Sequence, residues 1–146
     1  MSKTAITFAA IFLLICGFAT IDADAASASH TAAKASATKA ATAWLKLIDA
    51  GDYAASWDAA GSYFKEHVTA DQWTQKVGPA RQSLGALVSR KIKIAKYLTT
   101  LPDAPDGEYV VIQYQSSFAH KKSAVETVTP MLDTDGQWRV SGYYIR

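Results

Sequence analysis

The spacing of apolar residues changes once along the chain, from a helical period to a strand period. Across residues 37–50 the apolar side chains recur at i, i+3, i+4 and i+7, which places them on one face of a helix. From residue 87 onward apolar and polar side chains alternate, as they do in strands. Runs of helices followed by runs of strands indicate the α+β class. We therefore expect N-terminal helices packed on one face of a curved four-stranded antiparallel sheet.

Local sequence signals predict where the helices begin and end. Gly51 follows the first helix and predicts its end, because glycine enters the left-handed C′ conformation without a Cβ penalty. Thr69 and Gln72 form the capping-box pattern at the start of a later helix. Within that helix Pro79 predicts a kink or a break, since proline donates no backbone hydrogen bond. Gly85 marks the expected end of the helix.

Four strands are expected, over residues 87–101, 108–118, 125–133 and 137–146. The connection between the first two is rich in Pro, Asp and Gly, which predicts an irregular turn. The last two strands are joined by an Asp-Gly turn at residues 135–136, a strong signal for a β-hairpin. The strands therefore predict a meander in which sequence neighbours pair.

The strand register decides which side chains face the helices. Turns of two or four residues near His120 and Gly136 would pair odd with even positions, whereas a three-residue turn would invert part of the assignment. The even-length turns predict an aromatic face toward the helices and leave Glu126 on the opposite face. A pocket for a small apolar ligand is then expected between helices and sheet, lined by Trp57, Tyr114, Thr127, Trp138 and Tyr144.

The same register places an unusually apolar set of side chains on the outer face of the sheet. An antiparallel sheet that faces water alternates more cleanly, and a contiguous apolar patch favours a partner. A homodimer through this outer face is predicted, in which one patch is used twice. Its candidate residues are Val111, Val128, Leu132, Tyr143 and Ile145.

The beginning of the chain has the organisation of a signal peptide. Lys3 supplies a positive charge, and the apolar stretch over residues 5–18 is too short for a stable membrane span. We predict cleavage after Ala25, so that residues 1–25 are removed on export to the periplasm. Residues 26–39 then form a low-complexity tail that is mobile at its start, and residues 40–146 form a single α+β domain.

Two other interpretations of the N-terminus stay open. One is a retained membrane anchor, and the other is a lipoprotein, because Cys16 lies in a segment similar to a lipobox. The bulky Ile15 occupies the position where a small residue is expected before a lipidated cysteine. Cleavage after Ala25 removes Cys16, the only cysteine, and leaves a mature chain without disulfides.

The net charge and the positions of the histidines argue against nucleic-acid binding and against a metal site. The net charge of +2 is too mild to argue for nucleic-acid binding. Arg90 and the lysines of the strand over residues 87–101 form a basic run, for which a solvated sheet edge is preferred to a polyanion-binding surface. His30, His67 and His120 do not have metal-ligand spacing, so neither a metal site nor a cofactor is predicted.

Several short motifs follow the order of a known family, at residues 44–53, 56–57, 81, 84–85, 90, 102–109, 126–128 and 136–144. Together they cover residues 43–146 and resemble the bacterial exported family called domain of unknown function 4019. The resemblance implies no catalytic residue. The order of helices and strands is also similar to cystatin-like and nuclear-transport-factor-2-like cones, which host enzymes, binding modules and dimerisation modules alike.

The predicted function is an exported, non-catalytic binding or assembly module. The alternative is a small-molecule enzyme, of the hydro-lyase or isomerase type, that uses the cavity of the cone. A third class is a binder of polyanions or of the envelope surface. A buried ionisable pair in the cavity would favour the enzyme, whereas a cavity filled by side chains would favour the module.

Overall fold

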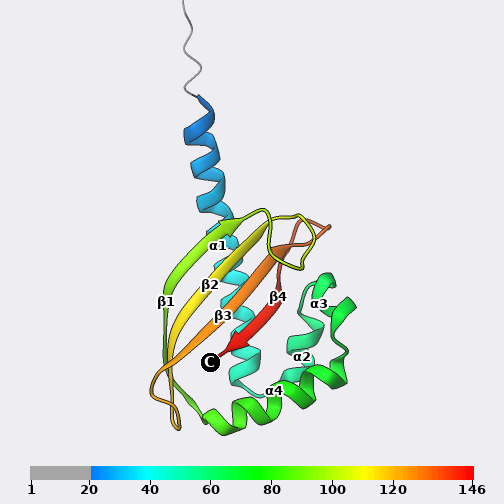
Figure 1. The fold of residues 1–146 in the computed structure, drawn as a ribbon, viewed down its shortest axis with the longest axis vertical. Helices are drawn as coiled ribbons and strands as arrows, with labels where there is room; N and C mark the ends of the chain where they lie inside the picture. Colours follow the sequence, from blue (N-terminus) through cyan, green and yellow to red (C-terminus); the bar gives the residue numbers. More distant parts are fainter. Residues whose placement is uncertain (1–20) are drawn as a thin grey trace, which may run out of the picture.

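The computed structural model of the protein describes residues 21–146, in which four helices precede four strands (Figure 1). The helices are α1 (Ile21–Asp49), α2 (Tyr53–Asp58), α3 (Ser62–His67) and α4 (Ala70–Leu84). The strands are β1 (Leu87–Leu98), β2 (Tyr109–Phe118), β3 (Ala124–Leu132) and β4 (Trp138–Ile145). The predicted α+β class is confirmed. Most of the predicted signal peptide lies outside the described residues.

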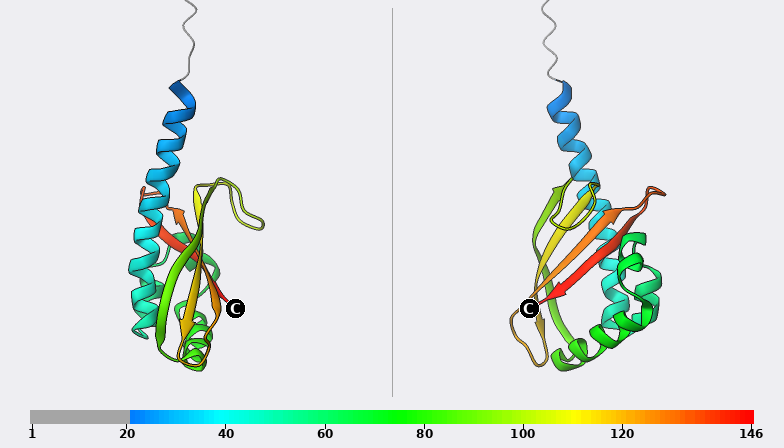
Figure 2. Two further views of the ribbon diagram at one scale, coloured as in Figure 1. Left: turned by 90° about the vertical axis from the view of Figure 1, so that its left-hand side faces the viewer. Right: turned by 45° about the vertical axis from the view of Figure 1, so that its right-hand side comes forward.

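The four strands form one antiparallel sheet in the order β1-β2-β3-β4. Helix α1 crosses one face of this curved sheet and contacts all four strands. Helix α2 packs against both α1 and α4, and α3 packs against β4. In the side view of Figure 2, α1 lies along one face and no helix lies along the other face of the described sheet. We call this second face the outer face.

Helix α1 is longer than the sequence pattern predicted. It includes residues 26–39, which were expected to form a tail that becomes helical only toward its end. Over residues 23–49 the first buried side chain is Ala37. The start of the helix projects beyond the sheet (Figure 1). His30 stacks on Tyr97 of β1 with ring centroids 4.2 Å apart. The alanine-rich composition of the segment explains its helicity, since alanine has the highest helix propensity.

Gly51 ends α1 as predicted. Its φ is +75°, in the left-handed region that favours glycine. Its N–H donates to Ile48 O at 3.1 Å, and the N–H of Asp52 donates to Leu47 O at 2.9 Å. These two bonds are those of the Schellman motif, which satisfies carbonyl groups left open at the helix end.

The capping box of α4 is also confirmed, and of the predicted kink or break at Pro79 the break is wrong. Thr69 Oγ1 accepts from Gln72 N at 3.2 Å, and Gln72 Oε1 accepts from Thr69 N at 3.0 Å. The helix continues through Pro79 and ends at Gly85, whose φ is +75°. Tertiary packing holds the segment helical, because one side of it is buried through Trp73, Val77 and Arg81.

The faces of β3 are the reverse of those predicted. The β2–β3 connection has five residues, 119–123, an odd number, so even positions pair with even positions. Tyr114 lies opposite Glu126, and both are buried on the helix-facing side. Val128 is also buried, whereas Thr127 belongs to the outer face. The expectation that Glu126 lies on the outer face is therefore wrong.

A β-bulge changes the register once more between β3 and β4. The shift lies between Thr129 and Pro130, so that Val128 pairs with Tyr143 beyond it. Tyr143 consequently packs against the core. Tyr144 is 62 % exposed, which contradicts its predicted place facing the helices. Alternation of apolar and polar residues does not show where an extra residue is inserted in a strand. The sequence therefore could not predict that Tyr143, and not Tyr144, faces the helices.

Aromatic rings fill the space between α1, α4 and the sheet. The ring of Trp73 lies 5.7 Å from that of Trp44 and 5.1 Å from that of Phe64, measured between centroids. Both indole N–H groups bind Ser56 of α2: Trp44 Nε1 donates to its carbonyl at 2.7 Å and Trp73 Nε1 to its hydroxyl at 2.9 Å. One buried serine therefore fixes two tryptophans from two different helices.

Candidate functional site

Glu126 is a buried carboxylate at the centre of a hydrogen-bonded network in the described chain. Its side chain is fully buried on the helix-facing side of β3. Oε1 accepts hydrogen bonds from Arg90 Nε at 2.7 Å and from the hydroxyl of Ser116. Oε2 accepts from Arg90 Nη2 at 3.0 Å and from Tyr143 Oη at 2.7 Å. Both carboxylate oxygens are therefore fully engaged by groups of the fold.

Asp49 and Arg81 extend this network toward solvent. Arg81 Nη2 donates to Asp49 Oδ1 at 2.8 Å. Arg90 binds the same carboxylate twice, with Nη1–Oδ2 at 2.6 Å and Nη2–Oδ1 at 2.9 Å. Arg81 Nη1 lies 3.7 Å from Glu126 Oε2, within ion-pair distance but without a hydrogen bond. We call the whole set the carboxylate–arginine cluster: Asp49, Arg81, Arg90, Ser116, Glu126 and Tyr143.

Strand alternation brings the sheet members of the cluster together. Arg90 of β1 lies opposite Ser116 of β2, and Glu126 of β3 lies opposite Tyr114, two residues before Ser116 on the same face. Tyr143 reaches the carboxylate from β4. All four strands thus contribute one side chain to a single point beneath the helices.

Two helices supply the remaining members. Asp49 is the last residue of α1. Arg81 follows Trp73 and Val77 on α4 at i+8 and i+4, so the buried face of that helix turns it toward the sheet. Its guanidinium lies over the ring of Phe118, with the carbon of the guanidinium 4.5 Å from the ring centroid. The cluster therefore ties both long helices to the sheet.

The charges of the cluster balance, with two carboxylates and two guanidinium groups. Burial opposes the charge of Arg90, but its hydrogen bonds to Asp49 and Glu126 outweigh that effect and raise its pKa. Burial, reinforced by the charge of Glu126, raises the pKa of the Tyr143 hydroxyl. Arg90 therefore stays charged, and Tyr143 stays a neutral hydrogen-bond donor at neutral pH.

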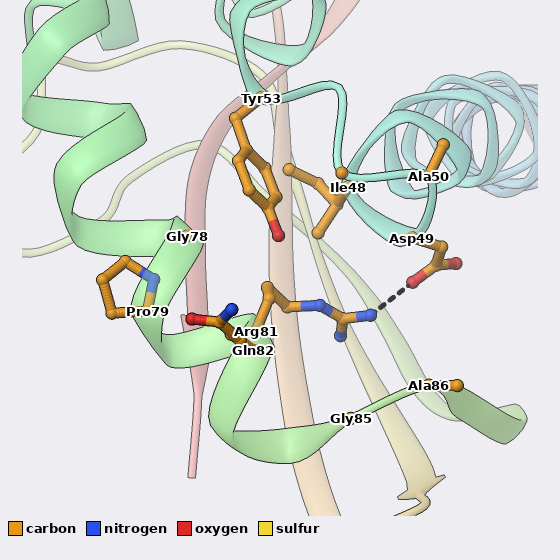
Figure 3. A pocket seen from close by; sticks show the side chains of 11 residues that line it. Ile48, Asp49, Ala50, Tyr53, Gly78, Pro79, Arg81, Gln82, Gly85 and Ala86 are labelled. Carbon is orange, nitrogen blue, oxygen red and sulfur yellow. Dashed lines mark hydrogen bonds and ion pairs between the residues drawn. The ribbon is translucent and has the colours of Figure 1, made fainter.

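An open hollow of about 630 Å³ lies beside the cluster, between the end of α1, α2 and α4. Asp49 and Arg81 are the charged groups in its lining, and the ring of Tyr53 extends into the same space from α2 (Figure 3). Glu126 is not part of this lining. Solvent at the hollow therefore meets the outer end of the cluster, while its central carboxylate stays covered.

The five predicted pocket residues do not line one cavity. Tyr114 is buried and borders a hollow between α1 and β1. Trp138 is half-buried and borders different hollows, between α1 and β4. Thr127 and Tyr144 lie opposite each other on the outer face. Trp57 is half-buried on α2, where its indole N–H donates to a backbone carbonyl at 2.7 Å. The positions of these five side chains therefore do not support a common pocket.

The residues predicted for a dimer face are divided between the two sides of the sheet. Val128 is in the core and Tyr143 belongs to the cluster. Leu132 and Ile145 fall on the helix-facing side by register. Val111 alone keeps its predicted place on the outer face. The patch that motivated the homodimer is therefore much less apolar than expected, while self-association itself stays a prediction.

Residues 21–146 show neither a cluster of metal-ligating side chains nor a membrane-spanning helix. Within that range, no group of three or more His, Cys, Asp or Glu side chains is placed to hold a metal ion. His67 Nδ1 lies 2.8 Å from a backbone oxygen of its own helix, and His120 Nδ1 lies 3.3 Å from one at the end of α4. No helix in the described part of the chain has the length and apolar character needed to cross a membrane.

Sequence reasoning missed most of the cluster. The sequence predicts a solvated basic run that includes Arg90, and it predicts no role for Asp49 or Arg81. Two signals were present: Glu126 is a carboxylate inside a predicted strand, and Arg81 continues the i, i+4 spacing of Trp73 and its buried neighbours. The spacing of Arg81 indicates a buried charge, whereas the position of Glu126 in a strand does not decide which face it occupies, and neither signal identifies a partner.

Comparison with known proteins gives one match. The family model described as "Protein of unknown function (DUF4019)" matches residues 40–143. Searches of curated proteins and of solved structures find no match to the chain. The matched segment contains every member of the carboxylate–arginine cluster.

Proposed function

The chain belongs to this family of proteins of unknown function, DUF4019, and we propose that it is an exported, non-catalytic binding or assembly module. The observation that supports the proposal is the saturation of Glu126. A general base needs a free lone pair within reach of a substrate proton. Both oxygens of Glu126 instead accept hydrogen bonds from Arg90, Ser116 and Tyr143, and Glu126 is not in the lining of the hollow beside the cluster.

On this proposal the cluster is a structural clamp. It joins α1 and α4 to all four strands through charge-assisted hydrogen bonds, which are stronger than neutral ones and fix a geometry. The clamp holds the sheet as a rigid platform and leaves its outer face and the β1 edge uncovered. That face alternates apolar, hydroxyl and amide side chains, all of them half-buried: Val111, Gln113, Gln115, Thr127 and Thr129. Such a surface suits contact with another protein segment.

Export to the periplasm is part of the proposal and rests on the signal-like N-terminal sequence. Intact-mass measurement of the exported protein should give a chain that begins at Ala26. A mass that includes a diacyl group on Cys16 would contradict cleavage at this site and support the lipoprotein.

Site-specific photo-crosslinking tests the binding surface. A photoreactive residue is placed at Gln113 or Thr127 on the outer face and, as matched controls, at Gln75 or Lys76 on the exposed side of α4. The proposal expects a discrete crosslinked product in the native periplasm from the outer-face positions only. Products from the α4 positions alone would overturn it.

The small-molecule enzyme remains a second candidate because one observation favours it. A buried ionisable pair, Arg90 and Glu126, does lie beneath an open hollow, and Asp49 connects that pair to the hollow. If the hollow is an active site, Asp49→Asn should abolish turnover of its substrate. The module predicts instead that Asp49→Asn, once circular dichroism shows the variant to be folded, still gives the crosslinked product at Gln113.

A further inference from the structure

Strand β1 is the uncovered edge of the described sheet. At the opposite edge, α3 packs against β4, and the N–H of Gly61 donates to Val140 O at 2.8 Å. Strand β1 has 12 residues and pairs on one side only, with β2 (Figure 1). An uncovered edge presents a row of backbone N–H and C=O groups that can pair with an added strand.

Exposed apolar side chains concentrate on this edge. Across the described residues, four large apolar side chains are exposed, and three of them lie on β1: Val88 at 68 %, Ile92 at 46 % and Ile94 at 52 %. Ile92 lies opposite Tyr114 on the helix-facing side, whereas Ile94 lies opposite Gln113 on the outer side. A strand added beside β1 would therefore find apolar contact on both of its faces.

The charged side chains of β1 that form no ion pair with any described residue are all positive. Arg90 is engaged by the carboxylate–arginine cluster. Lys91, Lys93 and Lys96 are exposed, make no ion pair with any described residue, and share the strand with no acidic residue. A partner strand that fits this edge carries carboxylates opposite the lysines. A second copy of β1 fits poorly, because pairing would place lysines of both copies side by side.

We propose that the β1 edge is the docking strand for an acidic, extended segment of a partner protein, which adds to the sheet by β-augmentation. The inference rests on the proposed binding function and names its partner class. The two register shifts in β1, between Leu87 and Ser89 and between Ile92 and Ile94, interrupt the edge. Bulges and lysines on an edge strand prevent it from pairing with unrelated edge strands. The β1 edge should therefore bind a strand of opposite charge in preference to others.

A synthetic peptide tests the inference directly. The probe is a fluorescent octapeptide that alternates Glu with Val, and its binding to the purified exported protein is measured by fluorescence anisotropy. One control alternates Lys with Val, and another is the acidic peptide with alternate backbone amides N-methylated. We expect the acidic peptide alone to bind, with affinity that falls as salt rises. N-methylation should weaken binding of the acidic peptide by at least about tenfold, because it removes backbone N–H groups that would donate hydrogen bonds to β1.

Charge-reversal variants locate the site on the protein. Lys93→Glu combined with Lys96→Glu should weaken the acidic peptide by about tenfold or more. The matched control is Lys121→Glu combined with Lys122→Glu, in the exposed β2–β3 connection, which should leave binding unchanged. Circular dichroism melts of both variants show whether each remains folded.

Four results would overturn the docking strand: no binding at millimolar peptide, equal binding of the N-methylated peptide, equal effects of the two lysine pairs, or dimerisation of the protein through β1. The N-methylated result would indicate a polyanion-binding surface instead. If crosslinking at Gln113 still captures a partner while the peptide fails, only the docking strand is wrong. If that crosslinking also fails, the proposed binding function is wrong as well.

Discussion

The carboxylate of Glu126 lies 2.7 Å from Nε of Arg90, although β2 separates their two strands. Ser116 stands between them on β2, opposite Arg90, and its hydroxyl donates to the same carboxylate. A side-chain bridge therefore spans three strands on the helix-facing side. The Glu126 side chain is 0 % exposed and that of Arg90 is 12 % exposed, so the pair is almost completely desolvated. Desolvation is costly, and the pair is stable only while both charges are present.

Removing one charge of this pair should strongly destabilise the fold. Glu126→Gln preserves side-chain volume but leaves two guanidinium groups, those of Arg81 and Arg90, with the single carboxylate of Asp49. We expect a loss of ~3–5 kcal/mol in the free energy of unfolding, as for other broken buried pairs. Urea denaturation measures it. Arg90→Met should cost a similar amount, and the double variant should cost less than the sum of the two single changes.

The surface pair Arg139–Asp135 is the control for that experiment. Its Nη2–Oδ2 distance is also 2.7 Å, but the Asp135 side chain is 54 % exposed. Asp135→Asn should leave the free energy of unfolding nearly unchanged, because water screens exposed pairs. If Glu126→Gln behaves like Asp135→Asn, the cluster does not hold the fold together.

The sequence predicts features that depend on neighbouring residues better than features that depend on residues far apart in the chain. The ends at Gly51 and the capping box at Thr69 depend on neighbours a few residues away, and both are confirmed. The face of Glu126 depends on the length of a connection and on a bulge, neither of which leaves a trace in a period-two pattern. The cluster depends further on pairing Asp49 and Arg81 with residues far along the chain. The i, i+4 spacing of Arg81 indicates the buried face of its helix, but only the fold supplies its partners.

Gly51 should resist substitution for a conformational reason alone. Its φ is +75°, and a Cβ added there would meet no heavy atom within 4 Å. Gly51→Ala should therefore cost about 1–2 kcal/mol, the penalty of the left-handed conformation for an L-residue, and Gly51→Val should cost more. Thermal and urea melts of the two variants measure the difference.

Gly78 offers the opposite case within α4. A Cβ at this position would make ordinary contacts of 3.5 Å with the ring of Tyr53. Gly78→Ala should stabilise the helix by about 0.5–1 kcal/mol, because alanine loses less backbone entropy on folding. Two glycine-to-alanine changes should thus shift the melting temperature in opposite directions. Equal shifts for Gly51 and Gly78 would contradict the C′ role of Gly51.

Ser56 should be needed for its hydroxyl rather than for its volume. Ser56→Ala leaves the indole N–H of Trp73 buried without an acceptor, although Trp44 keeps its bond to the backbone carbonyl. The expected loss is about 1–3 kcal/mol, the desolvation penalty of an unpaired buried donor. Ser83→Ala on the exposed side of α4 is the matched control and should be nearly neutral, because water replaces its bond. Equal effects would show that the Ser56 hydroxyl is dispensable.

The N-terminal cap of helix α3 should depend on pH. Helix α3 begins after Gly61, which has no side chain to cap it, and Asp133, which follows β3, caps it from far along the chain. Asp133 Oδ2 accepts from Ser62 N at 3.1 Å, and Oδ1 accepts from the Ser62 hydroxyl. The hydroxyl bond, the backbone N–H bonds and the charge of Arg139 lower the pKa of Asp133 below its ordinary value of 3.8.

A carboxylate with a lowered pKa in the folded state stabilises the protein above its unfolded pKa and loses that contribution as pH falls through the folded pKa. Asp133→Asn should therefore cost about 1 kcal/mol at pH 7, as the loss of a helix cap does, and the difference from the natural protein should shrink below pH ~4. Urea unfolding at several pH values measures this difference. The control is Asp106→Asn, in the exposed β1–β2 connection, which removes the same charge without removing a cap. If the difference in stability between the natural protein and the Asp133→Asn variant widened as pH fell, the bonded form would be the protonated acid, and the carboxylate would not be the cap of α3.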